Sequence, residues 1–204
     1  MTRIIIFAKA PLPGFAKTRL IPALGATGAA ELAQRMLLNT LHEAIAAKIG
    51  TVELCVTPAI SHPAWHPAWR GVQFPAGIEI SDQGEGDLGA RLALAAERSL
   101  ANAERVVLIG TDCAEMSGGL LREAAQALHK HDAVIHCTSD GGYALLGLQR
   151  FSPFLFSDMP WSTDAVANTT LARIGQLGWS VHVGQMLHDV DEPQDLKYLP
   201  EQWR

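Results

Sequence analysis

The chain has 204 residues, 48% of them hydrophobic and 18% charged, with a formal net charge of −5. This length and composition suffice to bury a full hydrophobic core, and we expect one globular domain over residues 1–204. The acidic balance argues against a general binder of nucleic acids, and no run reaches the length of a signal-peptide core or an integral membrane segment. The three cysteines lie far apart and lack the spacing of metal ligands. We therefore expect a cytoplasmic protein with reduced thiols, and the oligomeric state stays open.

The opening stretch, Arg3–Leu20, has the pattern of a buried strand followed by a cationic loop. Ile4–Phe7 is an apolar run typical of a strand that is buried on both faces. The loop after it contains Lys9, Lys17 and Arg19, and a loop after the first parallel strand lies at the edge where open α/β sheets bind ligands. A solvated basic loop is the alternative. The concentration of cations at this edge of an acidic protein favours a site for phosphate oxygens.

Helices and strands alternate through the first half of the chain. We expect a helix from Thr27 or Gly28 to near Gly50, a strand over Thr51–Thr57, a short strand over Gly77–Ser81, and a helix from its N-cap Asp87 to about Ala101 with Leu88 facing inward.

Two segments between these elements carry further signals. The turn Gln83–Gly89 is glycine-rich, which allows a backbone to approach a ligand closely, and Gln83 is a candidate for contacting a base or ribose. A tandem repeat, His62–Trp65 and His66–Trp69, has the residue types of a metal site or a stacking platform. Its prolines and the lack of other ligands favour a structured surface loop instead.

Asp112 follows the clearest buried strand of the chain. The strand Arg105–Gly110 is rich in valine, leucine and isoleucine, and the sequence Gly110–Cys113 ends it. A carboxylate at this position faces the ligand crevice and needs a positive partner. A divalent cation bound to a diphosphate is one such partner. The other interpretation is a loop aspartate that is hydrogen-bonded to nearby backbone.

Asp140 lies in a turn between two expected strands, Asp132–Cys137 and Tyr143–Leu148. Asp-Gly between strands is typical of a hairpin, so the sheet would contain an antiparallel strand, and Asp140 can have a purely structural role. It is also a second carboxylate that can reach the crevice. Before any comparison with known families, the residues favour neither interpretation.

The last third of the chain contains three helix starts and one strand. We expect Ser117 to cap a helix, Ser162 or Thr163 to cap another that ends near Leu177, a strand over Val181–Val183, and a final helix whose capping box pairs Asp191 with Gln194. Capping is therefore the default role of Asp191. One carboxylate oxygen can cap while the other binds a metal.

Six motifs in this order resemble one bacterial family, the radical-SAM/selenodomain-associated glycosyltransferases, which are similar to glycosyltransferase-A enzymes. The motifs span nearly the whole chain: Phe7–Leu20, Gly84–Gly89, Gly110–Cys113, Asp140–Tyr143, Trp161–Thr163 and Asp189–Asp191. The resemblance implies the fold of the nucleotide-diphospho-sugar transferases, a three-layer α/β/α sandwich around a mixed, mostly parallel sheet. Ala114 departs from the proline that is usual at this position in the family.

The resemblance also implies site residues. Lys17 and Arg19 would contact nucleotide phosphates, and Asp112 and Asp191 would bind Mg²⁺ or Mn²⁺. We expect the nucleotide to be bound by Ala8, Lys9, Ala10, Pro11, Gly14, Lys17, Arg19, Gln83, Gly84 and Thr111. We expect Asp140, Gly141, Gly142 and Trp161 to line the side of a small-molecule acceptor.

These residues predict a metal-dependent transferase that uses a nucleotide-sugar as donor. Asp140 would be the general base, while Lys17 and Arg19 would stabilise charge on the phosphate oxygens. One alternative is a nucleotidyltransferase that joins a nucleoside triphosphate to a small phosphorylated acceptor, a reaction that needs no base. A second alternative is a non-catalytic nucleotide-binding domain.

Overall fold

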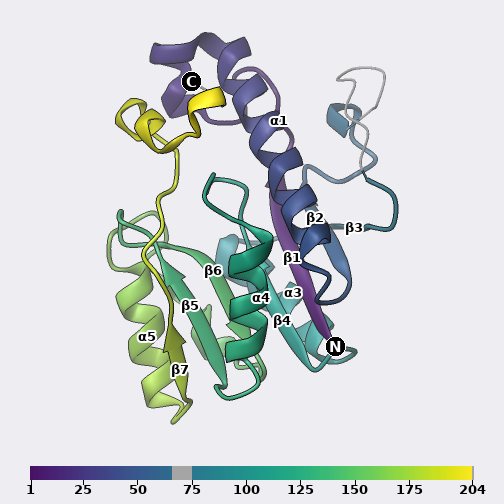
Figure 1. Cartoon of the computed structure of the whole chain (residues 1–204), viewed down its shortest axis with the longest axis vertical. Coiled ribbons are helices and arrows are strands. Elements are labelled where there is room, and N and C mark those ends of the chain that lie inside the picture. Colours follow the sequence, from purple (N-terminus) through teal and green to yellow (C-terminus); the bar gives the residue numbers. More distant parts are fainter. Residues whose placement is uncertain (66–74, 204) are drawn as a thin grey trace.

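The computed structural model of the protein describes residues 1–65 and 75–203. These residues build a seven-stranded sheet in the order β3-β2-β1-β4-β6-β5-β7 (Figure 1). The strands are β1 (Thr2–Lys9), β2 (Val52–Thr57), β3 (Glu79–Asp82), β4 (Arg105–Ile109), β5 (Ala133–Cys137), β6 (Tyr143–Leu148) and β7 (Val181–Val183). The α-helices are α1 (Ile21–Ala47), α3 (Leu88–Leu100), α4 (Gly118–Ala127) and α5 (Val166–Gln176). Short 3-10 helices are η1 (Thr18–Leu20), η2 (Pro63–Trp65), η3 (Pro153–Leu155), η4 (Pro193–Tyr198) and η5 (Glu201–Trp203).

Most neighbouring strands run parallel. β1 is parallel to β2 and β4, β2 to β3, and β5 to β7. β6 is antiparallel to both β4 and β5, because the turn at Asp140 reverses the chain directly after β5. The expected α/β class with a mixed, mostly parallel sheet is therefore confirmed, and so is the antiparallel strand predicted from the Asp-Gly turn.

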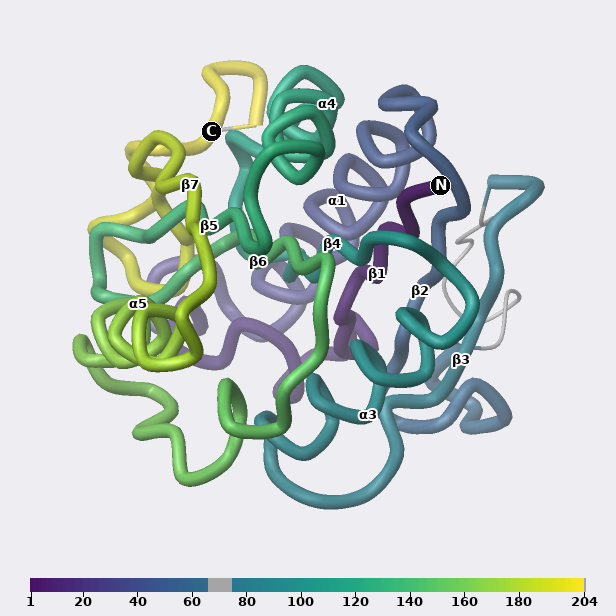
Figure 2. The backbone as a smooth tube through the Cα atoms, turned by 90° about the horizontal axis from the view of Figure 1, so that it is seen from below, coloured from purple at the N-terminus to yellow at the C-terminus, as the bar shows by residue number. Residues whose placement is uncertain are grey.

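Helices cover both faces of the sheet. Figure 2 shows α1 and α4 on one side and α3 and α5 on the other. In β1, Ile4 and Ile6 pack in the core on the α1 and α4 side, while Ile5 packs in the core on the α3 and α5 side. This explains the apolar run in the sequence, because a strand that is covered on both faces buries the side chains on both of its sides.

The helix starts expected at Asp87 and Ser117 are confirmed. Asp87 Oδ1 accepts a hydrogen bond from Ala90 N at 2.8 Å, and Ser117 Oγ accepts one from Leu120 N at 3.3 Å. The start of α1 is earlier than expected, because the helix begins at Ile21 and continues through a kink at Gly25, which has φ 69° and ψ 166°. A glycine is suited to this left-handed backbone conformation, and the regular part of the helix follows it.

Three expectations at helix ends are wrong. The N-cap of α5 is Ala165, which makes no side-chain capping bond, while Thr163 lies two residues before it and its Oγ1 accepts from Ala165 N. The capping box at η4 pairs Glu192 with Asp195, one residue later than expected. Leu88 is 43% exposed because it begins α3 at the mouth of the cleft described below.

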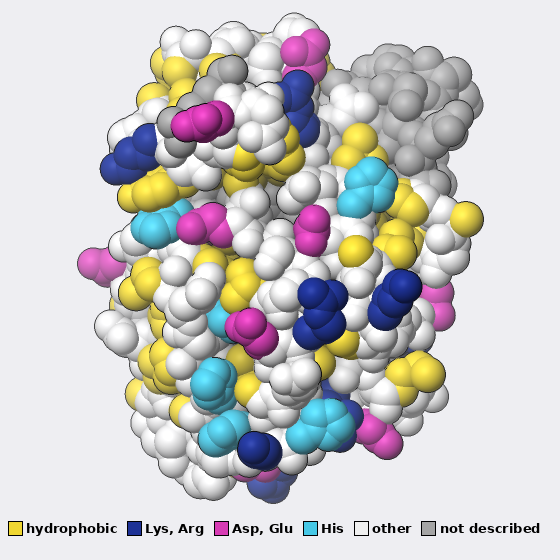
Figure 3. All heavy atoms as spheres, viewed as in Figure 1, with side chains coloured by type: hydrophobic (Ala, Val, Ile, Leu, Met, Phe, Trp, Pro, Cys, Tyr) yellow, Lys and Arg dark blue, Asp and Glu magenta, His cyan; other side chains and the backbone are white. Residues whose placement is uncertain are grey.

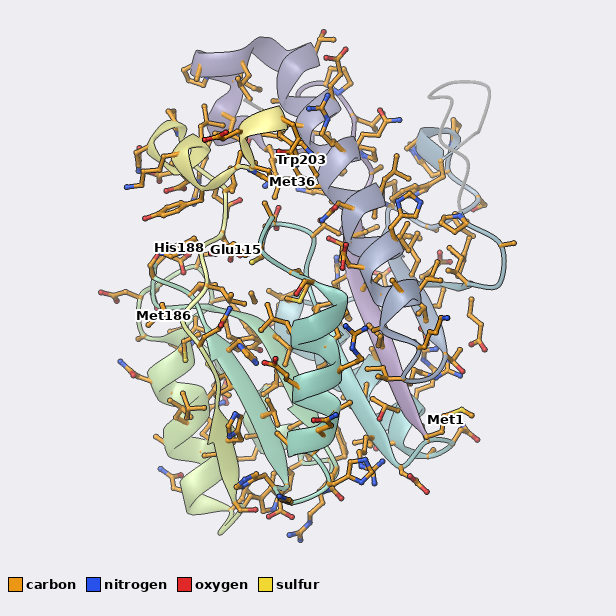
Figure 4. All side chains as sticks on the ribbon, viewed as in Figure 1. Met1, Met36, Glu115, Met186, His188 and Trp203 are labelled. Carbon is orange, nitrogen blue, oxygen red and sulfur yellow. The ribbon has the colours of Figure 1, made fainter. Side chains whose placement is uncertain are left out.

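The C-terminal segment closes the molecule over the start of α1. In Figure 1 the yellow chain leaves β7 and crosses to the end of the molecule where α1 begins, and Figure 4 labels Met36 and Trp203 there. Met36, Val190 and Leu199 are buried together in a small core, and Trp203 packs against it. This crossing carries residues 187–191 past the carboxyl ends of the parallel strands.

The first half of the His62–Trp69 repeat forms η2. Trp65 is buried, and its Nε1 donates to Pro58 O at 2.9 Å, which fits the predicted structured loop. The second half of the repeat lies outside the described residues. On the face shown in Figure 3, cationic and anionic side chains are interspersed. Among the described helices, none is long and apolar enough to cross a membrane.

Candidate active site

A cleft of about 690 Å³ lies at the carboxyl ends of β1 and β4. Its walls come from segments that are far apart in the sequence, namely the loops after β1 and β4, the turn between β5 and β6, and residues 161–164 and 189–191. Ligands of open α/β sheets bind at this edge. The volume is in the range of pockets that enclose small organic ligands and cofactors, about 300–1,000 Å³.

Lys17 lies at the centre of the polar part of this cleft. Its side chain is only 4% exposed, and its Nζ donates to Asp112 Oδ1 at 2.6 Å, to Val190 O at 2.6 Å and to Asp191 Oδ1 at 3.4 Å. These three acceptors match the three protons of an ammonium. Burial alone would lower the pKa of Lys17, but Asp112 and Asp191 outweigh it and the pKa is raised. The lysine is therefore a charged bridge between two carboxylates.

The backbone brings Asp112 and Asp191 together. Val190 N donates to Asp112 O at 2.8 Å, and Cys113 pairs with Asp189 in an isolated antiparallel bridge. Next to this bridge, the backbone N of His188 donates to Glu115 Oε2 at 2.8 Å. The side chains of His188 and Glu115 lie side by side in Figure 4. Asp191 is not the N-cap of η4, because the capping box there pairs Glu192 with Asp195. Its carboxylate is therefore free to face Lys17.

Asp189 is a third carboxylate of the cleft, which the sequence analysis did not select as a site residue. Burial raises its pKa to about 8, and the neighbouring charges of Asp112, Asp191 and Asp140 act in the same direction. The signal that could have identified Asp189 is its spacing from Asp191, because alternate residues of an extended segment lie on the same side of the chain. The thiol of Cys113 is no nucleophile at neutral pH, since burial raises its pKa to about 12.

Asp140 combines the two roles that the sequence left open. Its Oδ1 accepts from Thr138 Oγ1 at 2.6 Å and from Gly142 N at 3.1 Å, so it holds the turn between β5 and β6. Asp140 also lines the cleft. Within the described part of the chain, these hydrogen bonds reach Oδ1 alone, which leaves Oδ2 available to a ligand.

The turn at Asp140 packs directly against the segment 161–164. A Cβ placed on Gly141 would lie 2.2 Å from Asp164 O, and Ala167 N donates to Gly141 O at 2.8 Å. Trp161 lines the same wall and meets Tyr143 edge to face, with ring centroids 6.5 Å apart. The indole Nε1 of Trp161 is buried, and no described residue accepts its proton. Asp140 and Trp161 therefore share one wall of the cleft.

The cations Lys9 and Arg19 of the opening loop also line the cleft, in exposed positions. Arg19 is 65% exposed, and its Nη1 lies 4.0 Å from Glu192 Oε1, a separation at which the ion pair is weak. Lys9 Nζ lies 4.6 Å from the ring centroid of Phe15. Phe15 is 39% exposed and lines the cleft, but a single aromatic residue in a loop gave no signal in the sequence.

Gln83 is buried in the floor of the cleft. Its Nε2 donates to Ala8 O at 3.2 Å and to Cys55 O at 3.1 Å, so the amide fastens the turn before α3 to the ends of β1 and β2. The expected nucleotide residues that line the cleft are Ala8, Lys9, Lys17, Arg19, Gln83 and Thr111. Four other residues expected to bind the nucleotide do not line the cleft, namely Ala10, Pro11, Gly14 and Gly84. Among the residues expected to bind the acceptor, Gly141 does not line it.

The donor set of the cleft fits a divalent cation that arrives with phosphate oxygens. No group of three or more described His, Cys, Asp or Glu residues has the geometry of a complete metal site. Asp112 and Asp191 do share one cation, the ammonium of Lys17. Mg²⁺ is usually bound by one or two carboxylates together with substrate phosphates, and Asp112 and Asp191 match the protein part of such a ligand set.

Comparison with known proteins assigns the chain to a family. Residues 40–163 match the model of a family described as an uncharacterized protein conserved in bacteria (DUF2064). The chain belongs to this family. No curated protein matches it.

Several solved structures share the fold of this chain. A protein from Desulfovibrio desulfuricans G20, provisionally described as a nucleotide-diphospho-sugar transferase, has 28% sequence identity and a TM-score of 0.89, over 98% of this chain and 87% of that chain. The manganese complex of Rv0371c from Mycobacterium tuberculosis H37Rv has 19% identity and a TM-score of 0.57, over 97% and 96%. CMP:2-keto-3-deoxy-manno-octonic acid synthetase complexed with CTP has 12% identity and a TM-score of 0.58, over 96% and 95%. The last two likenesses show the fold alone.

Proposed function

We propose that this protein is a metal-dependent transferase that takes its donor from the nucleotide-diphospho-sugars. The observation that carries the proposal is the ion cluster at the carboxyl ends of β1 and β4, where Lys17 bridges Asp112 and Asp191. A cluster of opposite charges at this edge is suited to a diphosphate with its counter-ion. The six motifs that resemble the radical-SAM/selenodomain-associated glycosyltransferases support the same proposal, as does the fold shared with the Desulfovibrio protein.

The residues of the loop after β1 would bind the diphosphate. Lys9 and Arg19 face the cleft with exposed cationic groups, and the guanidinium of Arg19 can hold two phosphate oxygens at once. A divalent cation held by Asp112 and Asp191 would neutralise the charge that develops on the leaving diphosphate. Preorganised charges in a site of low dielectric constant make a large contribution to catalysis.

Asp140 would act on the acceptor. In a glycosyl transfer, an acceptor hydroxyl forms a new bond to the sugar, the bond from the sugar to the diphosphate breaks, and the hydroxyl proton goes to a base. The Oδ2 atom of Asp140 is available for this proton, because the turn engages Oδ1. Trp161 and Gly142 would form the wall on which the acceptor lies.

Nucleotidyl transfer is the second candidate. Here a phosphate of the acceptor attacks the α-phosphate of a nucleoside triphosphate, and pyrophosphate leaves. The cations Lys9 and Arg19 on one wall would suit the larger number of phosphates, and CMP:2-keto-3-deoxy-manno-octonic acid synthetase with CTP shares the fold. Because a phosphate is already an anionic nucleophile, Asp140 would only orient the acceptor.

The test is a thermal-shift screen of nucleotides and nucleotide-sugars with and without Mn²⁺. A ligand at one hundred times its Kd stabilises the folded state by about 2.7 kcal/mol, which is easily seen as a rise in Tm. We expect Asp112→Asn to keep the fold and to lose the Mn²⁺-dependent part of this rise. The matched control is Asp195→Asn, which removes one charge nearby while its amide oxygen can still accept from Glu192 N. If Asp112→Asn and the control respond like the wild type, the metal assignment is wrong.

A further inference from the structure

We propose that Lys17 is an internal counter-ion that occupies the metal position, so that the cleft binds a metal–nucleotide complex and not the free metal ion. This inference rests on the proposed function, because it assumes that Asp112 and Asp191 are the metal ligands. It adds that the substrate binds as a complex with its metal ion, and that Lys17 leaves the two carboxylates as this complex arrives.

The ammonium of Lys17 fills the position between the Oδ1 atoms of the two carboxylates. Lys17 Nζ lies 2.6 Å from Asp112 Oδ1 and 3.4 Å from Asp191 Oδ1. A Mg²⁺ ion binds its oxygens at about 2.0–2.1 Å, so it needs the space that the ammonium fills. The ammonium is also held by Val190 O at 2.6 Å and is shielded from water, with 4% of the side chain exposed. A metal ion can bind these two Oδ1 atoms together only after Lys17 has left them.

The free energy of this exchange depends on what accompanies the metal. A bare cation would release Lys17 without a new partner, and a buried charge that loses its partner is strongly destabilising. A metal–diphosphate complex supplies a cation to Asp112 and Asp191 and a phosphate anion to Lys17 in the same step. Each of the three charged groups then keeps an opposite charge. The metal and the diphosphate are thus expected to bind with positive coupling.

The backbone of Lys17 is consistent with a residue that is held in place by its side chain. Lys17 has φ 46° and ψ 46°, in the left-handed region. For a residue with a Cβ, this conformation has a free-energy cost relative to the right-handed one. The salt bridges to Asp112 and Asp191 and the bond to Val190 O are the contacts that offset the cost.

The experiment measures Mn²⁺ affinity without nucleotide, by the electron paramagnetic resonance signal of free Mn²⁺ or by calorimetry. We expect Lys17→Met to bind Mn²⁺ at least about tenfold more tightly than the wild type, which corresponds to about 1.4 kcal/mol. The matched control is Lys9→Met, which removes the same charge from the same cleft, since Lys9 lies over Phe15 and away from the two carboxylates. Lys9→Met should change the affinity much less, and adding Asp112→Asn to Lys17→Met should abolish the gain.

A second measurement uses stability. Lys17→Met leaves the carboxylate cluster without its cation, so its Tm should fall without metal and should rise with Mn²⁺ by more than that of the wild type. Equal Mn²⁺ affinities of the wild type and Lys17→Met, or a Lys17→Met protein that does not fold even with Mn²⁺, would overturn the inference.

Failure of this inference can be told from failure of the proposed function. If Lys17→Met binds Mn²⁺ like the wild type while Asp112→Asn still loses Mn²⁺-dependent nucleotide binding, then the exchange is wrong and the metal ligands stand. If Asp112→Asn retains Mn²⁺-dependent nucleotide binding, the metal ligands themselves are wrong and the exchange falls with them.

Discussion

At the scale of single residues, Asp140 divides its two oxygens between structure and cleft. Oδ1 accepts from Thr138 Oγ1 and Gly142 N, and these bonds fix the carboxylate in one orientation. A base that is fixed before the substrate arrives needs no reorganisation during the reaction. An asparagine can keep both bonds through its amide oxygen, so the substitution changes only the group that faces the ligand.

We expect Asp140→Asn to separate glycosyl from nucleotidyl transfer once a substrate pair is known. Loss of a general base typically lowers turnover by about 10²–10⁴-fold, and the donor contacts are untouched. In a glycosyltransferase kcat should therefore fall by this factor at unchanged donor affinity. In a nucleotidyltransferase the loss should appear in the KM for the acceptor. The measurement is steady-state kinetics with saturating donor, and an unchanged kcat and KM would remove Asp140 from both roles.

Some site residues could be predicted from the sequence because their position follows from one strand. Asp112 is the third residue after the end of β4, so a buried apolar run was enough to place it at the ligand edge. The residue pattern alone could not decide the role of Asp191, because the pairs Asp191–Gln194 and Glu192–Asp195 both have the spacing of a capping box. The contact of Lys17 with Asp112 joins residues 95 positions apart, and no local pattern encodes such a distance.

At the scale of elements, the wall that we propose for the acceptor depends on the contact of the β5–β6 turn with the segment before α5. Gly141 has φ 91°, and a Cβ there would lie 2.2 Å from Asp164 O and 2.4 Å from Asp164 Cα. Both the backbone conformation and the close approach require glycine. The neighbouring bond from Ala167 N to Gly141 O ties the first turn of α5 to this contact.

Gly141→Ala should therefore destabilise the protein and displace Asp140. A non-glycine residue in a disfavoured backbone region costs about 1–3 kcal/mol, and the clash with Asp164 backbone adds to it. The control is Gly175→Ala in α5, where a Cβ meets no atom within 4 Å. This change should stabilise the helix by about 0.5–1 kcal/mol. Chemical denaturation measures both, and equal stabilities of the two variants would contradict the packing described here.

The elements that could be predicted from the sequence are those with a strong periodic or apolar signal. Val181–Val183 matches β7 residue for residue, and Tyr143–Leu148 matches β6. The ends of helices were harder to predict from the sequence. The start of α1 lies before Gly25, which interrupts the pattern, and the start of α5 is fixed by tertiary contacts of Gly141 and not by a local cap.

At the scale of the whole molecule, His136 couples the stability of the fold to pH. The residue lies in β5, only 3% exposed, and a Cβ on Gly184 would lie 2.2 Å from its ring. Burial lowers its pKa and His182 of β7 acts in the same direction, while the bond to Gln185 O and the charge of Glu123 in α4 oppose them. The net effect is a lowered pKa, so the folded protein favours the neutral ring.

The sign of the pH dependence follows from this shift. The unfolded chain binds a proton at His136 near the ordinary pKa of about 6.5, whereas the folded chain binds it only at lower pH. As the pH falls below about 6.5, the unfolded state is therefore stabilised relative to the folded state, and the free energy of unfolding decreases. One such group changes it by at most about 1.4 kcal/mol per pH unit.

We expect His136→Gln to reduce the loss of stability between pH 7 and pH 5, since glutamine has no proton to gain. The amide can still donate to Gln185 O, so part of the native bonding is kept. The control is His42→Gln, an exposed histidine on α1, whose stability curve should run parallel to that of the wild type. Urea denaturation at several pH values gives the three curves. A His136→Gln curve that is parallel to the wild type would mean that β5 and the segment after β7 separate, or admit water, before the ring takes up its proton.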